Sequence, residues 1–240
     1  AKRIAAITFT NKAAKEMRQR LGKRIKGEAA EGLTLCTFHA LGLKFLQIEH
    51  ASLGLKRGFS IFDADDSNAQ IKDLMPGAKN DAIEAAKNLI SRAKNAGLSP
   101  EQALEASKST REQEAARLYA RYQARLATFN AVDFDDLIRL PVQLLENDAE
   151  IAAAWRERIG YLLVDECQDT NDAQYRLLKV LAGSSGNFTC VGDDDQSIYA
   201  WRGANPDNLL QMAQDYPALQ VIKLEQNYRC SNRVLRAANT

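Results

Sequence analysis

Short, almost continuously apolar runs alternate with helical segments in this chain, and this pattern constrains its fold most strongly. The apolar runs lie at 4–9, 33–38, 161–164, 188–191 and 220–224. Strands that are apolar on both faces are typical of a parallel sheet with helices on both sides. We therefore predict an α/β fold with a parallel sheet, in which one helix spans 11–25 and a second ends near residue 50.

A long helical stretch interrupts this alternation. Between residues 62 and 159 the strand pattern disappears, and alanine-rich helical periodicity replaces it. Two helix starts carry the capping-box pattern, Ser99 with Gln102 and Thr110 with Gln113. We divide the chain into four parts: a first part of the α/β core at 1–60, an all-helical insertion at 61–132, a second part of the core at 133–218 and the start of a further domain at 219–240.

The composition excludes several classes of protein. The 240 residues are 45% hydrophobic and 26% charged, which suits a globular fold with a buried core. No run approaches the roughly 18 apolar residues of a membrane span, and no signal segment is present, so we expect a cytoplasmic protein. The cysteines lack metal-binding spacing, and we expect reduced thiols. They are Cys36, Cys167, Cys190 and Cys230.

The net charge of +1 conceals a basic N-terminal end. Residues 1–26 hold nine lysines and arginines against the single acid Glu16. A basic helix can bind the phosphates of a nucleic acid. The alternative is an ordinary solvated helix face.

Two adjacent carboxylates follow the predicted strand at 161–164. Ligands of open α/β sheets bind beyond the carboxyl ends of the strands, which is where Asp165 and Glu166 stand. An aspartate there can hold Mg²⁺, and a neighbouring glutamate can polarise the water that attacks the γ-phosphate of a nucleotide. The alternative is a solvated turn in which Asp169 or Thr170 caps the next helix.

A second polar cluster follows the predicted strand at 188–191. It contains three acids, an amide, and the group Tyr199, Trp201 and Arg202. Stacking of bases on tyrosine and tryptophan, with arginine near the phosphates, is how single strands are bound without sequence preference. The alternative is that the two aromatic side chains pack at a domain boundary.

Five segments of the chain, in order, resemble successive motifs of superfamily 1A DNA helicases of the UvrD/Rep/PcrA family, most closely its Rep-like members. The segments are 8–14, 37–39, 164–169, 191–203 and 224–229. The resemblance implies a RecA-like motor core of the P-loop NTPase type. It also implies ATP hydrolysis with Mg²⁺, coupled to 3′ to 5′ movement on single-stranded DNA and to duplex unwinding.

The same resemblance assigns roles to individual residues. It implies Asp165 for Mg²⁺, Glu166 as the catalytic base and Gln196 as the sensor that links the γ-phosphate to the DNA track. Arg229 would contact the γ-phosphate, and Tyr228 would stack near the adenine. The path of single-stranded DNA would be lined by Phe9, Thr37, His39, Tyr199, Trp201 and Arg202. Taken alone, Phe9 would more often be a core residue and His39 an ordinary hydrogen-bonded histidine.

Two features depart from the family pattern. Cys167 stands where an aromatic residue is usual, and we expect this to change packing behind the site and leave the chemistry intact. The G-x-x-x-x-G-K-[ST] phosphate loop is absent, because the pair Gly22 and Lys23 has Met17 and Arg24 at the flanking positions. We expect this chain to be an internal piece of a longer protein, with the loop upstream, and to be inactive alone.

Two alternative functions stay open, a repair helicase of the UvrD kind and a non-catalytic DNA-binding scaffold. The expected ligands are ATP, single-stranded DNA and forked duplex DNA, with replication or repair proteins as candidate partners and no membrane. Arg117, Arg121 and Arg125 recur every four residues and share one predicted helix face. We expect this face to contact duplex DNA, and ordinary exposed charge is the alternative.

Overall fold

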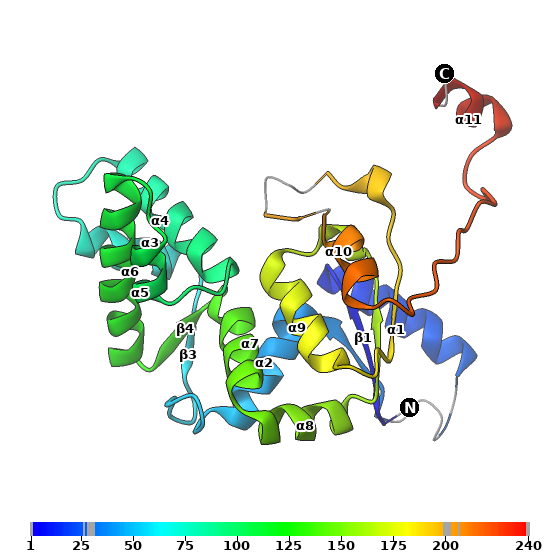
Figure 1. Ribbon diagram of the computed structural model, residues 1–240, viewed down its shortest axis with the longest axis horizontal. Helices are drawn as coiled ribbons and strands as arrows, with labels where there is room; N and C mark the ends of the chain where they lie inside the picture. The colour runs from blue at the N-terminus through cyan, green and yellow to red at the C-terminus, as the bar shows by residue number, and fades with distance from the viewer. Residues whose placement is uncertain (1, 26, 28–31, 199–202, 206, 239–240) are drawn as a thin grey trace.

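A four-stranded parallel sheet forms the centre of the molecule, as the computed structural model shows (Figure 1). The structure describes residues 2–25, 27, 32–198, 203–205 and 207–238. The strand order is β2–β1–β5–β6, and all three pairings are parallel. The strands are β1 (Ile4–Thr8), β2 (Thr34–Thr37), β5 (Tyr161–Val164) and β6 (Phe188–Cys190). The predicted α/β class is therefore confirmed.

Alternate residues of β1 face two different cores. Ala5 and Ile7 belong to the main hydrophobic core, whereas Ala6 belongs to a small cluster with Ala14 and Leu35. This alternation follows from the period of two along a strand. All three β1 residues are at most 3% exposed, because β1 lies between β2 and β5.

Four helices supply most of the main core on one side of the sheet. They are α2 (Phe38–Glu49), α7 (Asp136–Asn147), α8 (Ala149–Arg158) and α9 (Asp172–Ala182). Phe45 and Trp155 stack at 4.7 Å between ring centroids, and the Trp155 indole donates to Glu49. The indole N–H thus keeps a partner while the ring is buried.

The opposite face of the sheet is more open than we predicted. In the described part of the chain it is covered by α1 (Asn11–Arg24), which packs on the small cluster through Ala14. Leu163 and Val191 remain 39% and 51% exposed. A hollow of about 820 Å³, lined by residues of α1 and of the sheet, reaches Asp165. The expectation of helices on both faces holds only in part. On this face α1 packs mainly against β1 and β2, and side chains at β5 and after β6 stay exposed.

A separate helical block lies beside the sheet (Figure 1). Its helices are α3 (Ala64–Leu74), α4 (Asn80–Asn95), α5 (Pro100–Glu105) and α6 (Thr110–Thr128). They enclose their own core around Tyr119 and Tyr122. The predicted capping box at Ser99 is confirmed, whereas the second box joins Ser109 with Glu112, one residue earlier than expected. Ser109 takes the cap because Thr110 is already helical.

A second, two-stranded parallel sheet joins the helical block to the core. It consists of β3 (Ser60–Phe62) and β4 (Ala131–Asp133). The expectation of no strand between 62 and 159 was therefore wrong, because three residues are too few to show a period of two. The predicted limits of the insertion, 61–132, fall within these two strands, and the domain division stays a prediction.

The predicted strand at 220–224 was also wrong. After α10 (Asp207–Asp215) the chain runs in an extended form, without pairing to a strand of the described residues, to α11 (Asn232–Ala238) (Figure 1). Val221, Ile222 and Leu224 are 75–85% exposed. Their apolar character indicated a strand, but a strand needs a neighbour for its backbone groups. Among the helices that the structure describes, none is long and apolar enough to cross a membrane.

Candidate functional site

The two predicted catalytic carboxylates stand where β5 ends. The N–H of Asp165 donates to Ile7 O at 2.9 Å, which extends the β1–β5 ladder by one bond. Glu166 then adopts a left-handed backbone, with φ 55° and ψ 46°. A non-glycine residue rarely takes this conformation, which costs roughly 1–2 kcal/mol. This left-handed conformation turns the chain sharply and leaves the Glu166 side chain exposed at the carboxyl edge of the sheet.

Gln168 holds Glu166 and joins the ends of β5 and β6. Its Nε2 donates to Glu166 Oε2 at 2.8 Å, and its Oε1 accepts from the N–H of Asp193 at 3.1 Å. The side chain is only 1% exposed, so both bonds are shielded. A Cβ on Gly192 would lie 2.9 Å from Gln168 Oε1, which explains the glycine at that position.

A third hydrogen bond extends this connection to Gln196. Gln196 Nε2 donates to Asp193 Oδ2 at 2.6 Å. Gln196 is the last residue of the short helix η3 (Asp194–Gln196), and Asp193 directly precedes this helix. Glu166 and Gln196 are thus linked through Gln168 and Asp193. The sequence alone assigned no role to Gln168, because its burial between two strand ends depends on the fold.

The turn after Glu166 is fixed by side-chain hydrogen bonds. It forms the short helix η2 (Cys167–Asp169), and the hydroxyl of buried Thr170 donates to Cys167 O at 2.7 Å. The next helix, α9, is capped by Asn171, which accepts from the N–H of Gln174 at 2.9 Å. The alternative in which Asp169 or Thr170 caps α9 was therefore wrong.

Acidic side chains gather at this edge of the sheet. Burial first, and then the charge of Glu166, raise the pKa of Asp165 and the pKa of Asp169 above the usual range. Asp169 Oδ1 is buried without a hydrogen-bond partner. The excess of carboxylate oxygens favours a bound cation.

The donor set fits Mg²⁺ that arrives with a phosphate ligand. Mg²⁺ is usually held by one or two carboxylates together with waters and substrate phosphates. Asp165 and Glu166 supply carboxylate oxygens of this kind. The described residues contain no group of three or more histidine, cysteine, aspartate or glutamate side chains arranged around a metal position. A metal held entirely by such side chains is not the arrangement seen here.

Cys167 packs behind the carboxylates, and the effect of a cysteine there on packing and chemistry stays a prediction. It is fully buried in the main core, against which the half-buried Cys190 of β6 also packs. The backbone N–H of Cys167 donates to Val191 O at 2.9 Å. The residue thus fills the space between the ends of β5 and β6.

Two of the predicted DNA-path residues lie at the carboxyl edge of the sheet, Phe9 directly after β1 and Thr37 as the last residue of β2. Phe9 is half-buried and packs edge-on against Phe38, with 6.4 Å between ring centroids. Thr37 is 8% exposed, and its hydroxyl accepts from the N–H of Ala40, which caps α2. Phe9 therefore has a core role and Thr37 a capping role, and their contact with DNA stays a prediction.

His39 lies where α2 meets the loop between β4 and α7. Its ring packs against that of Phe134, with 5.8 Å between centroids. Burial lowers the pKa of His39, and the charge of Asp135 partly opposes this. Phe134 is 52% exposed, so the pair presents an aromatic surface. A DNA contact here stays a prediction.

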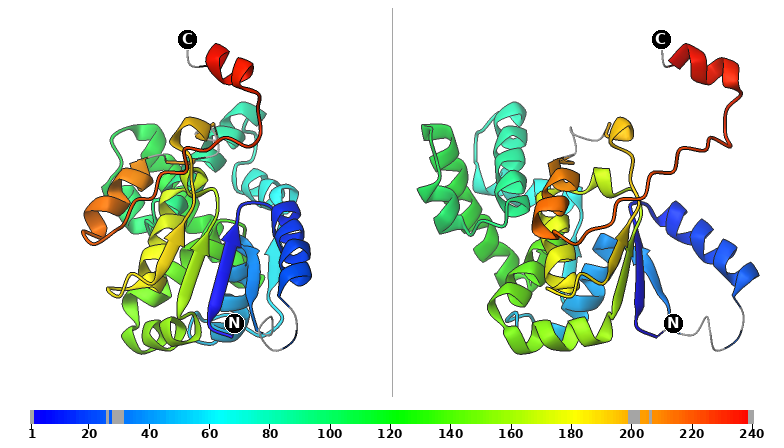
Figure 2. Two further views of the ribbon diagram at one scale, coloured as in Figure 1. Left: turned by 90° about the vertical axis from the view of Figure 1, so that its right-hand side faces the viewer. Right: turned by 45° about the vertical axis from the view of Figure 1, so that its right-hand side comes forward.

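Of the remaining predicted site residues, Tyr228 and Arg229 are not brought to the carboxylates. Tyr199, Trp201 and Arg202 lie outside the described residues. Tyr228 is 92% exposed, and Arg229 is also exposed. The segment that carries both runs away from the sheet toward α11 (Figure 2). Their roles stay predictions.

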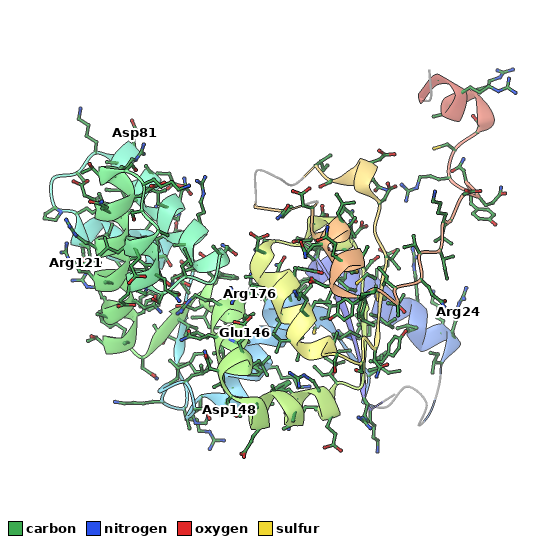
Figure 3. All side chains as sticks on the ribbon, in the orientation of Figure 1. Arg24, Asp81, Arg121, Glu146, Asp148 and Arg176 are labelled. Atoms are coloured by element: carbon green, nitrogen blue, oxygen red, sulfur yellow. The ribbon has the colours of Figure 1, made fainter. Side chains whose placement is uncertain are left out.

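The three arginines of the predicted face of α6 have different surroundings. Arg117 and Arg121 are exposed and line a hollow of about 490 Å³ between α3, α4 and α6. Arg125 instead pairs with Asp73 of α3 at 3.4 Å. Figure 3 places Arg121 on the side of the helical block away from the sheet.

Helix α1 lies within the basic N-terminal segment, residues 1–26. Arg18 donates to Leu35 O at 2.6 Å, and Arg20 pairs with Glu16 at 2.6 Å. Gly22 and Lys23 lie inside this helix, so their backbone amides do not form a phosphate loop. Binding of a nucleic acid by the other basic side chains of α1 stays a prediction.

A parallel sheet with paired carboxylates at its carboxyl edge, interrupted by a helical block, is the arrangement of RecA-like helicase domains. The chain belongs to the UvrD/REP helicase family, whose N-terminal domain model matches residues 1–217.

Curated relatives agree with this assignment. ATP-dependent DNA helicase Rep of Escherichia coli is 50% identical over all of this chain, as is Rep of Salmonella typhimurium. ATP-dependent DNA helicase PcrA of Leuconostoc citreum is 41% identical over 99% of the chain. The chain spans 36% of the length of the two Rep proteins and 32% of that PcrA.

Proposed function

We propose that this chain is part of the first motor domain of an ATP-dependent DNA helicase that moves 3′ to 5′ on single-stranded DNA. The observation that carries the proposal is the hydrogen bond from Gln168 to Glu166, beside Asp165 at the end of β5. An oriented glutamate at this position is what activation of an attacking water requires.

In this proposal the carboxylates have separate tasks. Asp165 binds Mg²⁺, which when bound neutralises phosphate charge and polarises the phosphoryl group. Glu166 is exposed and accepts a proton from the water that attacks the γ-phosphate. Gln168 keeps the Glu166 carboxylate in one orientation. Gln196 connects this site to the segment that carries Tyr199 and Trp201.

Single-stranded DNA would lie along the carboxyl edge of the sheet. Support comes from the aromatic pair His39 and Phe134 and from the basic helix α1. Forked duplex DNA and replication or repair proteins are the proposed partners, and the cytoplasm is the proposed location. Greater identity to Rep than to PcrA supports a Rep-like enzyme, and a repair helicase of the UvrD kind is the alternative within the same family.

A non-catalytic DNA-binding scaffold is the competing proposal. A scaffold has no need for a strained Glu166 backbone or for a buried amide that orients its carboxylate. The test is strand displacement by the intact protein, on duplexes with either a 3′ or a 5′ single-stranded tail. We expect ATP-dependent unwinding of the 3′-tailed duplex. DNA binding without ATP turnover would support the scaffold.

A further inference from the structure

The end of helix α4 in the helical block is hydrogen-bonded to the start of α9 in the motor core. Asn95, the last residue of α4, accepts a hydrogen bond at its Oδ1 from Asn171 Nδ2 at 2.7 Å. Its Nδ2 donates to Asp135 Oδ1 at 3.0 Å. Asn95 thus joins the loop after β4 to the cap of α9.

Each end of this link leads to a part of the proposed site. Asn171 directly follows Thr170, whose hydroxyl closes the turn that begins at Glu166. At the other end, Asp135 directly follows Phe134, whose ring packs against that of His39 at the proposed DNA edge with 5.8 Å between centroids. A polar connection from the His39 edge to the catalytic turn therefore runs from Asp135 through Asn95 to Asn171.

The surroundings hold Asn95 firmly in place. The preceding residue, Lys94, is fully buried and pairs with Asp133 at 2.6 Å and with Asp136 at 3.0 Å. These two aspartates flank Asp135 in the chain, so the partner of Asn95 is fixed as well. A hydrogen bond between two such fixed groups transmits displacement better than one between mobile side chains.

Arg176 fixes α9 against the same helix end. It donates to Ala96 O at 3.1 Å and pairs with Glu146 of α7 at 2.6 Å, and Figure 3 shows Arg176 and Glu146 side by side. A Cβ on Gly97 would lie 1.7 Å from Arg176 Nη1, so this close approach requires glycine. The ends of α4, α7 and α9 therefore meet at one junction.

We propose that Asn95 is a positioning residue that couples DNA binding to the catalytic turn, a role that gives the helical insertion a part in the motor. The inference rests on the proposed helicase function. A displacement of the His39 and Phe134 rings on DNA binding would move Asp135. Asn95 would transmit this displacement through its hydrogen bonds to Asn171 and so to the Glu166 turn. Loss of the link should lower DNA stimulation of ATP hydrolysis and leave the basal rate unchanged.

Two single variants of the intact protein separate the link from local stability. Asn95→Ala removes the hydrogen bonds of Asn95 to Asn171 and Asp135, and also those of its Nδ2 to Ser91 within α4. Asn171→Ser keeps a side chain that caps α9 but is too short to reach Asn95. Asn147→Ala is the matched control, because Asn147 also ends a helix and donates only to its own helix, at Gln143 O.

The readout is steady-state ATP hydrolysis with and without oligo-dT. We expect the DNA-stimulated kcat to fall about fivefold in Asn95→Ala and Asn171→Ser, which is the usual effect of one hydrogen bond. The KM for ATP, the rate without DNA and the control should not change. The double variant should lose no more than either single variant, because both remove the same bond.

The outcomes separate the link from the function on which it rests. Normal DNA stimulation in both single variants, or losses that multiply in the double variant, would overturn the link alone. A lower rate without DNA would show a purely structural role and would also overturn it. Absence of DNA-stimulated hydrolysis in the unsubstituted protein would overturn the proposed function, and the link with it.

Discussion

Gln168 Nε2 lies 2.8 Å from Glu166 Oε2, and this hydrogen bond fixes the carboxylate at the end of the central sheet. The same amide accepts from the N–H of Asp193 at 3.1 Å. One side chain therefore sets both the orientation of Glu166 and its separation from the end of β6. In the proposed enzyme, this arrangement would let hydrolysis and the DNA track respond to each other.

Replacement of Gln168 should slow hydrolysis without weakening nucleotide binding. Gln168→Ala leaves the buried N–H of Asp193 without its acceptor and frees the Glu166 carboxylate to rotate. We expect kcat for ATP in the intact protein to fall about tenfold, with KM within about twofold, as loss of one or two hydrogen bonds predicts. Gln211→Ala, at an exposed glutamine of α10, is the control. Equal turnover in both variants would show that Gln168 does not orient Glu166.

The arginine face of α6 should act through two of its three members. Replacement of Arg117, Arg121 and Arg125 together by alanine should weaken binding of a forked duplex at low salt, because each phosphate contact releases counterions. Arg125→Ala alone should have little effect, since Arg125 pairs with Asp73. Fluorescence anisotropy with a labelled fork checks this, and unchanged affinity in the triple variant would remove the role.

The buried ion pairs of Lys94 should make stability depend on this residue. Lys94→Met leaves Asp133 and Asp136 with fewer partners, and loss of one member of a buried ion pair costs about 3–5 kcal/mol. The free energy of unfolding, from urea titration of the 240-residue chain, should fall by that amount at pH 7. A loss below about 1 kcal/mol, the usual value of an exposed pair, would contradict this account.

The same variant should show a pH dependence of defined sign. Burial first, and then the charge of Asp136, raise the pKa of Asp133 to about 6 even beside Lys94. A group with a raised folded-state pKa contributes stability at low pH that is lost as the pH rises through that value. Without Lys94 the aspartate pKa values should rise further. The destabilisation by Lys94→Met should therefore be larger at pH 8 than at pH 5.

The 240 residues alone should not hydrolyse ATP. Asp165, Glu166 and Asp169 are acidic and repel a triphosphate unless a lysine and backbone amides compensate. Gly22 and Lys23 lie inside α1 and cannot do so. A malachite-green phosphate assay, with and without oligo-dT, should detect no DNA-stimulated turnover. Multiple turnovers would mean that the phosphate site lies elsewhere in these residues.

Some parts of the fold followed from sequence because they depend on local pattern. The apolar runs around β1, β2, β5 and β6 gave the parallel sheet, and the polar residues after Val164 gave the position of the candidate site. The capping box at Ser99 was also visible, since it needs only two residues at fixed spacing.

Other parts depend on contacts between distant residues. The strand β4 at Ala131–Asp133 exists through its pairing with β3, some 70 residues earlier in the chain. Gln168 and Asn95 have ordinary polar side chains, and only the fold shows that they bridge two elements. The apolar segment at 220–224 has the composition of a strand but pairs with no strand of the described residues.

The central claim is that Glu166 activates the attacking water, and Glu166→Gln in the intact protein tests it most directly. Glutamine keeps the size of the side chain and cannot accept the proton. We predict that Mg-ATP binding, measured by equilibrium titration, stays within about twofold, while single-turnover hydrolysis falls by at least about a hundredfold. Hydrolysis at a rate comparable to that of the unsubstituted protein would contradict the account.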